Sequence, residues 1–243
     1  MIFCAMMLII LVPSCGHAGD ECIVVAEFER GDVKDGVPGG WKVEKSQGTL
    51  DMTLDDDNGR SVLHLKSDNE SSYGISKEVM VDANIHHFLR WRWKAVTLPA
   101  GADVRKKERD DQAIQLYVAF EPTGWPRKLK MPLIGYVWDT EAPKGIDVTS
   151  SQPFAGRVRY VVLRNKEDDL NRWYTEERNI ATDYARLFPD IDGGKIRRIE
   201  GFSIYINSQN TGTAAESFIG DIRVCAEAVG DETPVAEEDR QLQ

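Results

Sequence analysis

The side chains best suited to binding a polar ligand lie on one face of three strand-like segments. In segments 88–96, 112–120 and 201–207, apolar and polar residues alternate, so each has one apolar face and one polar face. The polar faces carry guanidinium, amide and phenol groups: Arg92, Gln115, Tyr117, Tyr205 and Asn207. Amides and guanidinium groups donate hydrogen bonds in fixed geometry, and rings pack on the apolar faces of sugars. If the strands adjoin in one sheet, they predict a surface for a carbohydrate or other polar glycan; an ordinary solvated sheet face is the alternative.

Trp125 and the pair Asp110-Asp111 are further candidates for ligand contact. Trp125 lies in a proline-flanked loop, where its ring can be a platform for a ligand or an anchor for the loop. Asp110 and Asp111 could bind Ca²⁺ with help from loop carbonyls, because hard cations take several oxygen ligands. The basic residues of segment 105–109 favour a salt-bridged turn instead, so the pair is only a weak metal candidate.

No catalytic or metal motif in the sequence stands on its own. Glu176 and Glu177 are adjacent and would point to opposite faces of a strand, whereas a retaining glycosidase needs two carboxylates about 5 Å apart. The four histidines form neither a Ser-His-Asp order nor a zinc spacing. Segment 55–59, Asp-Asp-Asp-Asn-Gly, lacks the bidentate Glu of a calcium loop and is interpreted as a hairpin turn. We therefore predict no catalytic residue and no cofactor.

Strand patterns dominate the elements that must position these residues. The expected strands are 23–29, 41–45, 49–54, 62–66, 74–80, 88–96, 112–120, 133–138, 157–164, 173–180, 201–207 and 219–225. This pattern predicts a single all-β domain over residues 22–226, a two-sheet β-sandwich of jelly-roll type. One short helix is expected near 182–188, capped by Thr182 and stopped by Pro189. Trp91 and Trp93 share an apolar strand face and are expected in the core.

Composition limits the partners of this domain. The chain has 243 residues, of which 42% are hydrophobic, so it can bury a full core. Its formal net charge is −10, and segment 227–243 is predicted to be an acidic disordered tail. An acidic protein is a poor partner for nucleic acid, because a phosphate-binding surface is basic. A monomer is expected.

The N-terminal segment 1–18 has the pattern of a secretory signal peptide. It contains no acidic residue, lysine or arginine, and its apolar run over 6–12 is too short to span a bilayer. Gly16-His17-Ala18 supplies small residues for cleavage after Ala18. Lipid anchoring at Cys15, which follows a poor lipobox, and a buried N-terminal strand are the alternatives. We predict export to the periplasm or the extracellular space.

Export changes how the remaining cysteines are interpreted. Removal of the signal leaves Cys22 and Cys225, beside the first and last expected strands. A disulfide between them would join the two ends of the domain if these strands are neighbours in a sheet. Two free thiols are the alternative.

Several motifs occur together in a fixed order along the chain. They read Leu-Arg-Trp-Arg-Trp-Lys at 89–94, Leu-Pro-Ala-Gly-Ala-Asp at 98–103, Asp-Asp at 110–111, Gly-Tyr-Val-Trp at 135–138, Tyr-Thr-Glu-Glu-Arg-Asn at 174–179, the segment 183–188, and Gly-Asp-Ile at 220–222. Together they resemble an exported bacterial family catalogued as domain of unknown function 3047, over roughly residues 23–226. The resemblance implies export and a sandwich fold, and it implies no site residue. Segment 207–211 lacks the carboxylates towards which the family tends, which weakens a charge-based or metal-based role for that loop.

The sequence leaves three functions open. The first is an exported, non-catalytic β-sandwich that binds a carbohydrate or other polar glycan on its polar sheet face. The second is a glycoside-active enzyme on the same fold. The third is a structural or envelope module whose sheet face meets another protein.

Overall fold

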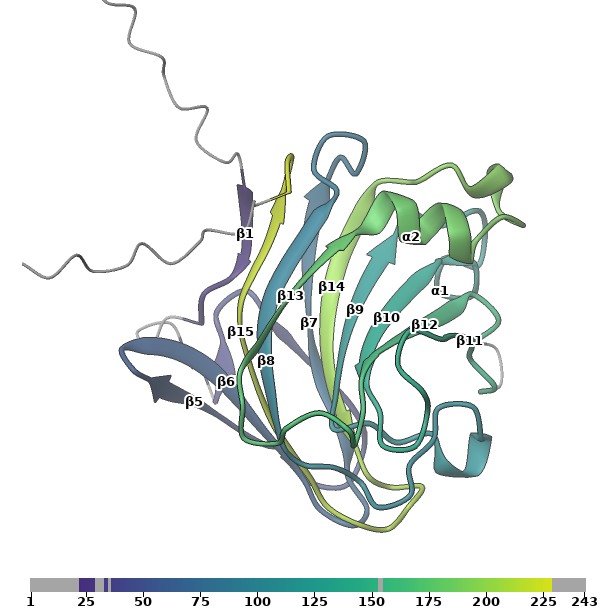
Figure 1. Ribbon diagram of the computed structural model, residues 1–243. Coiled ribbons are helices and arrows are strands. Elements are labelled where there is room, and N and C mark those ends of the chain that lie inside the picture. The colour runs from purple at the N-terminus through teal and green to yellow at the C-terminus, as the bar shows by residue number, and fades with distance from the viewer. Residues whose placement is uncertain (1–21, 29–32, 35, 153–154, 229–243) are drawn as a thin grey trace, which may run out of the picture.

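The computed structural model describes residues 22–28, 33–34, 36–152 and 155–228 (Figure 1). Its strands are β1 (Cys22–Ala26), β2 (Val33–Lys34), β3 (Val37–Pro38), β4 (Lys42–Gln47), β5 (Asp51–Asp57), β6 (Arg60–Ser67), β7 (Ser72–Val81), β8 (Phe88–Thr97), β9 (Ile114–Phe120), β10 (Leu133–Trp138), β11 (Asp147–Thr149), β12 (Val158–Arg164), β13 (Tyr174–Asn179), β14 (Ile199–Asn207) and β15 (Ala215–Cys225). The helices are α1 (Arg127–Lys130) and α2 (Ile180–Leu187), with 3₁₀ turns at Lys107–Arg109 and Asp192–Gly194. The predicted signal peptide and all but two residues of the predicted tail lie outside the described residues.

All strands except β2 and β3, which pair with each other, form two sheets that pack face to face. The six-stranded sheet has the order β13-β8-β15-β6-β5, with β1 added to β15. The seven-stranded sheet has the order β11-β12-β10-β9-β14-β7-β4, in which β10 and β12 are parallel. The predicted two-sheet β-sandwich is confirmed. The elements that were not predicted, β2, β3, β11 and α1, have two to four residues each, too few to show a period.

Aromatic side chains from both sheets meet in the core. Trp91 and Trp93 of β8 are fully buried, as predicted, and their rings meet edge to face with centroids 5.3 Å apart. Across the sandwich, Trp91 lies 5.3 Å from Tyr136 and Trp93 lies 6.0 Å from Trp138, both of β10. Burial of such large rings is a major source of stability, and each aromatic pair adds about 0.5–1.5 kcal/mol beyond the buried area.

Helix α2 closes the open side of the sandwich beside β13 (Figure 1). Its cap is Asn179 and not Thr182: the Asn179 side chain accepts a hydrogen bond from the Thr182 N–H at 3.0 Å. The helix therefore begins earlier than predicted, because the β13 strand leads directly into it. Its buried residues Ile180, Tyr184 and Leu187 follow the helical period and face the core.

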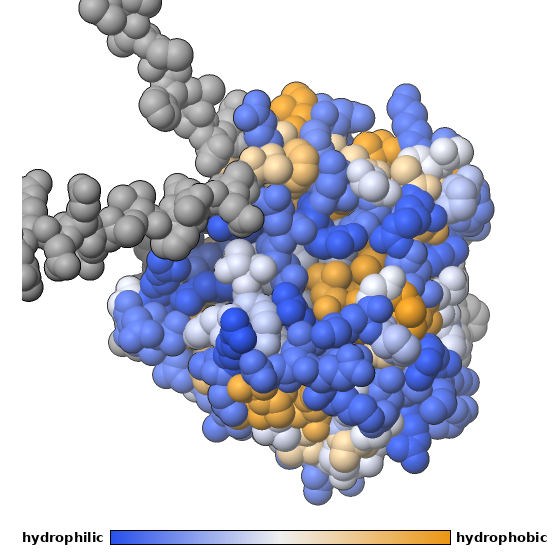
Figure 2. Space-filling model, viewed as in Figure 1, coloured by the Kyte–Doolittle hydropathy of each residue, from blue (hydrophilic) through white to orange (hydrophobic). Residues whose placement is uncertain are grey.

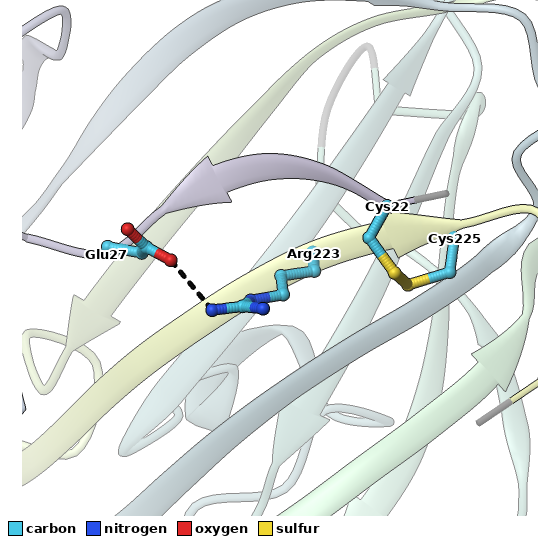
Figure 3. The surroundings of a disulfide bond; sticks show 4 residues. All are labelled: Cys22, Glu27, Arg223 and Cys225. Carbon is cyan, nitrogen blue, oxygen red and sulfur yellow. Dashed lines mark hydrogen bonds and ion pairs between the residues drawn. A yellow bond between two sulfur atoms is a disulfide. The ribbon is translucent and has the colours of Figure 1, made fainter. Parts of the chain in front are cut away.

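The Cys22–Cys225 disulfide joins the first and last strands, as predicted (Figure 3). The two cysteines are direct partners in the antiparallel β1–β15 pairing. An ion pair of 2.7 Å between Arg223 and Glu27 links the same two segments further along. Disulfides persist in oxidising compartments, so this bond is typical of an extracytoplasmic protein.

Candidate functional site

The strand pairing brings only part of the predicted polar surface together. β9 and β14 are neighbours in the seven-stranded sheet, and Tyr205 of β14 pairs with Gln115 of β9. Arg92 belongs to β8, a strand of the six-stranded sheet, so its outward side chain lies on the opposite side of the sandwich. The condition that all three strands adjoin in one sheet is met by β9 and β14 but not by β8. Alternation assigns a face to each residue, but it does not say which strands pair.

A row of tyrosine rings lies on the outward face of the seven-stranded sheet. The Tyr117 ring is 5.7 Å from that of Tyr205 and 6.1 Å from that of Tyr160, both in edge-to-face contact. Gly135 makes room for two of these rings, because a Cβ there would come within 2.8 Å of Tyr160 and 2.9 Å of Tyr117. Burial raises the pKa of Tyr205 and of Tyr160 to about 12, so both phenols are neutral hydrogen-bonding groups at neutral pH.

One half of this outward face is covered by loops. A second apolar cluster packs there over β10 and β12, formed by Val104, Val137, Ala142, Tyr160 and Val162. The Tyr117 hydroxyl is also enclosed, donating to the Gln115 side-chain oxygen at 2.5 Å. The open half of the face therefore lies over β7, β14 and the adjoining part of β9.

A groove of about 650 Å³ occupies this open half. We call it the sheet groove, and its lining residues are Ser76, Lys77, Glu78, Met80, Ala119, Arg127, Met131, Glu200, Gly201, Phe202 and Ser203. Ser203 of β14 pairs with Ser76 of β7 on one side and Tyr117 of β9 on the other. The floor of the sheet groove is made by the small outward side chains of Ser76, Ser203 and Ala119, of which the two serines carry hydroxyl groups. Tyr205 lies two residues beyond Ser203 on the same face and is partly exposed.

Ion pairs hold Glu78, Arg127 and Glu200 of the sheet groove, and Lys77 Nζ donates to the Val25 carbonyl at 2.8 Å. Arg127 Nη2 lies 2.7 Å from a Glu200 carboxylate oxygen, and Lys42 Nζ lies 2.8 Å from Glu78. The Lys42 hydrogen bond lowers the pKa of Glu78 below its usual range, so this carboxylate is ionised at neutral pH. A general acid of a glycosidase requires the opposite shift.

Trp125 stands out in the loop between β9 and β10. Its side chain is 85% exposed, and Met80, also exposed, lines the sheet groove. Trp125 precedes Arg127 by two residues, and Arg127 and Met131 of the same loop line the sheet groove. Most of the surface is hydrophilic in the view of Figure 2, where apolar residues form separate patches. An indole that is 85% exposed contributes little to the core.

Gln115 and Asn207 are engaged inside the protein. Their exposed fractions are 5% and 8%, and Gln115 Nε2 donates to Asn207 Oδ1 at 2.8 Å. Asn207 Oδ1 also accepts the Gln112 N–H at 2.8 Å, and Asn207 Nδ2 donates to the Asp110 carbonyl at 2.8 Å. The Gln115 and Asn207 side chains therefore link the start of β9 to the end of β14, next to the segment that contains Asp110 and Gln112. We do not include them in a ligand surface.

Asp110 and Asp111 do not form the predicted salt-bridged turn. Asp111 is fully buried and accepts hydrogen bonds from the Thr211 N–H at 2.6 Å and from the Asn210 N–H at 3.2 Å. The Asp110 carboxylate accepts from the side chains of Gln112 at 3.1 Å and Gln152 at 3.0 Å. Arg105 and Lys106 pair with another carboxylate, and amide groups donate to Asp110 and Asp111 instead. Within the described residues, no group of three or more His, Cys, Asp or Glu side chains could hold a metal ion.

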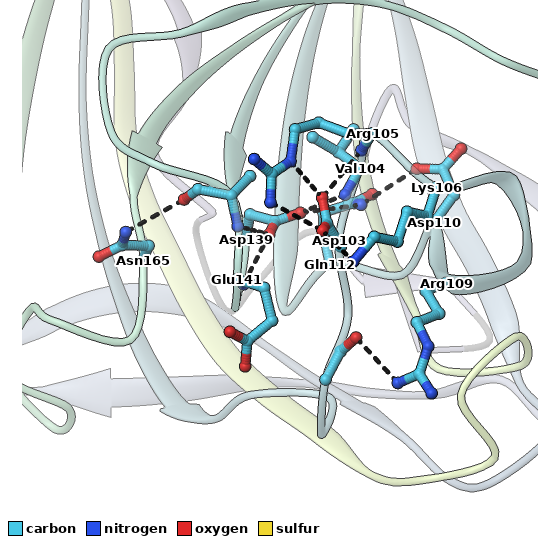
Figure 4. Close-up of polar contacts among 12 residues, drawn as sticks. Asp103, Val104, Arg105, Lys106, Arg109, Asp110, Gln112, Asp139, Glu141 and Asn165 are labelled. Atoms are coloured by element: carbon cyan, nitrogen blue, oxygen red, sulfur yellow. Dashed lines mark hydrogen bonds and ion pairs between the residues drawn. The ribbon is translucent and has the colours of Figure 1, made fainter.

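Asp103 receives the cations instead, as part of a buried network that the sequence did not reveal (Figure 4). Arg105 donates to Asp103 from Nε at 2.7 Å and from Nη2 at 2.8 Å, and these bonds hold the pKa of Asp103 far below its usual range. Asp139 is also fully buried, and desolvation raises its pKa although it accepts the N–H groups of Val104 and Ala142, each at 2.8 Å. The network fixes the loops at this end of the sandwich.

Glu176 and Glu177, adjacent in β13, lie in different environments. Glu176 accepts hydrogen bonds from Trp93 Nε1 at 3.0 Å and from Arg164 Nε at 2.7 Å. Glu177 is the direct partner of Arg90 in the β13–β8 pairing. Because neighbouring residues of a strand point to opposite faces, the two carboxylates do not act as a pair.

Solved structures with a related arrangement of strands include sugar-binding modules. The family 11 carbohydrate-binding module of a cellulosomal cellulase of Clostridium thermocellum is 10% identical, with a TM-score of 0.45, over 85% of this chain and 95% of that chain. A family 29 carbohydrate-binding module from Piromyces equi is 10% identical, with a TM-score of 0.38, over 88% of this chain and 95% of that chain. The glycoside hydrolase domain of Endo-D from Streptococcus pneumoniae R6 is 11% identical, with a TM-score of 0.40, over 78% of this chain and 22% of that chain. At this level of similarity the likeness concerns the fold alone.

Sequence comparisons give the family. No functionally curated protein matches the chain. In the part that the structure describes, no helix is both long and apolar enough to cross a membrane. The profile of the family described as "Protein of unknown function (DUF3047)" matches residues 39–223, in agreement with the motifs of the sequence. The chain belongs to this family.

Proposed function

We propose that this protein is exported and binds a neutral carbohydrate chain, without cleaving it, in the sheet groove. The observation that carries the proposal is the open groove on the outward face of the seven-stranded sheet, with a floor of small hydroxyl-bearing residues. Extended sugar chains need a long shallow surface with many hydrogen-bonding groups, and a sheet face with short side chains provides one. Ser203 can donate and accept a hydrogen bond with a sugar hydroxyl, and Ser76, whose hydroxyl donates to Glu44 at 3.0 Å, can accept one.

Aromatic side chains next to the groove supply the apolar contact. Tyr205 continues the groove floor along β14, and its ring is partly exposed. Trp125 projects from the loop that also supplies Arg127 and Met131 to the groove. Rings of this kind pack against the apolar face of a sugar, while the surrounding polar groups bind its hydroxyls. Of the six residues named from the sequence, Trp125, Tyr205 and the enclosed Tyr117 are the ones associated with this surface.

The charges in the groove support binding rather than hydrolysis. Glu78 and Glu200 each form an ion pair with a cation of the protein. Glycoside hydrolysis needs a protonated carboxyl group beside the scissile oxygen, and the lowered pKa of Glu78 works against that role. Export to the periplasm or outside the cell agrees with the Cys22–Cys225 disulfide.

Isothermal titration of the full chain with a panel of neutral hexasaccharides tests the proposal. We expect Ser203→Leu, which fills the groove floor, to abolish binding of any hexasaccharide that the native protein binds. Trp125→Ala should weaken binding about tenfold, as expected for loss of one stacking contact of about 1.4 kcal/mol. Leu170→Ala, which removes another exposed apolar side chain, should leave the affinity unchanged.

The controls separate binding from stability. Thermal unfolding of Trp125→Ala and Leu170→Ala should match the native protein, because both side chains are exposed. No binding by the native protein across the panel, or binding that Ser203→Leu leaves intact, would contradict the proposal. Release of reducing sugar from any hexasaccharide would show that the protein is an enzyme.

A further inference from the structure

A second hollow lies on the outward face of the six-stranded sheet. It has a volume of about 610 Å³, and four arginines line it: Arg60, Arg90, Arg92 and Arg223. They come from β6, β8 and β15, which are adjacent strands. We call this site the arginine hollow. It lies on the opposite side of the sandwich from the sheet groove.

Arg92 is held in place at the centre of the arginine hollow. Its Nη1 lies 3.0 Å from Asp57 and its Nε lies 2.6 Å from Asp221, and its guanidinium carbon sits 4.4 Å from the centre of the Trp173 ring. The side chain is only 12% exposed. Among the described residues, its buried Nη2 has no hydrogen-bond partner. Arg92 is therefore a fixed guanidinium group in the floor of the hollow, with Nη1 and Nε directed at carboxylates.

The remaining arginines add positive charge around this donor. Arg60 Nη1 lies 3.6 Å from Asp221, beyond hydrogen-bond distance, and its side chain is 67% exposed. Arg223 pairs with Glu27 at 2.7 Å, and Glu177 is the strand partner of Arg90. Asp221 is nevertheless the single carboxylate among the residues that line the hollow in the described chain. Four guanidinium groups and one carboxylate thus form the lining, and Asp57, Glu27 and Glu177 lie beside these arginines just outside it.

Rings and a further cation extend this surface along the sheet. The Trp173 ring lies 6.3 Å from that of Phe218, and Lys94 Nζ lies 4.3 Å from the Phe218 ring centre. His64 stacks on the other side of Phe218, with ring centres 3.9 Å apart. These contacts hold the Arg92 and Lys94 side chains in place beside the hollow.

We propose that the arginine hollow binds the carboxylate or sulfate group of an acidic saccharide. Guanidinium groups bind such oxyanions through two parallel hydrogen bonds, which gives both strength and orientation. Arg60, whose side chain is 67% exposed, and Arg90 supply these donors from β6 and β8, around the fixed Arg92. The site does not depend on the sheet groove, which has another lining and lies on the other sheet.

Isothermal titration of the full chain with trigalacturonate, neutral galactotriose and inorganic sulfate tests this site. Trigalacturonate should bind more tightly than sulfate, galactotriose should not bind at the hollow, and the affinity should fall as salt is added. Arg60→Gln and Arg90→Gln should each weaken trigalacturonate binding about tenfold, the effect of losing one charged hydrogen bond. Arg90→Lys keeps the charge but loses the planar donor pair, so it should restore only part of the affinity.

Arg109→Gln is the matched control, since it removes one exposed positive charge from a loop outside the hollow. Equal losses in Arg109→Gln and Arg90→Gln would overturn the proposal, because they would show general charge attraction. Absence of trigalacturonate binding, or binding of sulfate alone, would overturn it as well. Loss of trigalacturonate binding in Ser203→Leu but not in Arg90→Gln would place the ligand in the sheet groove and refute the second site only.

Discussion

Asp111→Ala should lower the free energy of unfolding by about 3 kcal/mol. The Asp111 carboxylate is fully buried and accepts three hydrogen bonds from one loop, from the Asn210 N–H at 3.2 Å, Asn210 Nδ2 at 3.1 Å and the Thr211 N–H at 2.6 Å. Each hydrogen bond to a charged group contributes about 1.5–3 kcal/mol. The loop is partly exposed, so water can replace part of this sum after the carboxylate is removed, and about 3 kcal/mol remains.

Urea unfolding followed by tryptophan fluorescence measures this loss. Asp111→Asn keeps one acceptor oxygen but places an amide donor against an N–H, so it should lose about half as much stability. Asp169→Ala is the control: this carboxylate is exposed and pairs with Arg172 at 3.2 Å, so its removal should change stability by less than about 0.5 kcal/mol. A loss below about 1 kcal/mol in Asp111→Ala, with an unchanged urea dependence, would show that the loop is held by other contacts.

Three further outcomes follow from other parts of the fold. Replacing both Cys22 and Cys225 by Ser should lower the urea midpoint, since a loop of this length gives an entropic upper limit of about 5 kcal/mol; an unchanged midpoint would contradict it. Burial raises the pKa of Asp110 in the folded protein, so protonation of this carboxyl group favours the folded state at low pH. That contribution to stability is lost as the pH rises through the folded pKa. Asp110→Asn should therefore gain stability relative to the native protein between pH 4 and pH 7 in thermal melts, and a constant difference would refute the argument. Gly135→Ala should cost about 1–3 kcal/mol by pushing two tyrosine rings apart, whereas Gly156→Ala, with open space around it, should be neutral.

The sequence predicted features that depend on local periodicity. Strand alternation placed Trp91 and Trp93 in the core, and the structure buries both completely. The Asn58-Gly59 turn between β5 and β6 has the positive φ values, 55° and 82°, that this pair of residues adopts readily. The disulfide was predictable because only two cysteines remain after the signal, beside the first and last strands.

Features that depend on strand pairing were not predictable in the same way. Arg92 shares the polar alternation of Tyr205, but alternation carries no information about which strand lies next to which. Asp111 follows a basic run in the sequence, yet it binds the backbone of a loop about a hundred residues later. Ser76 and Ser203 looked like ordinary strand residues, and they form a groove floor only because β7 and β14 pair in that register.

The position of β15 within its sheet has a consequence for the order in which the molecule can be made. β15 is the last strand of the described chain, yet it lies at the centre of the six-stranded sheet, where it pairs with β1, β6 and β8. While the chain is being synthesised, β6 and β8 therefore lack the strand that joins them and expose unpaired backbone edges. Synthesis adds about 5–20 residues each second, so this state lasts for seconds. The six-stranded sheet can be completed only after the ribosome has added residue 225, which makes the folding of this half of the sandwich a late event.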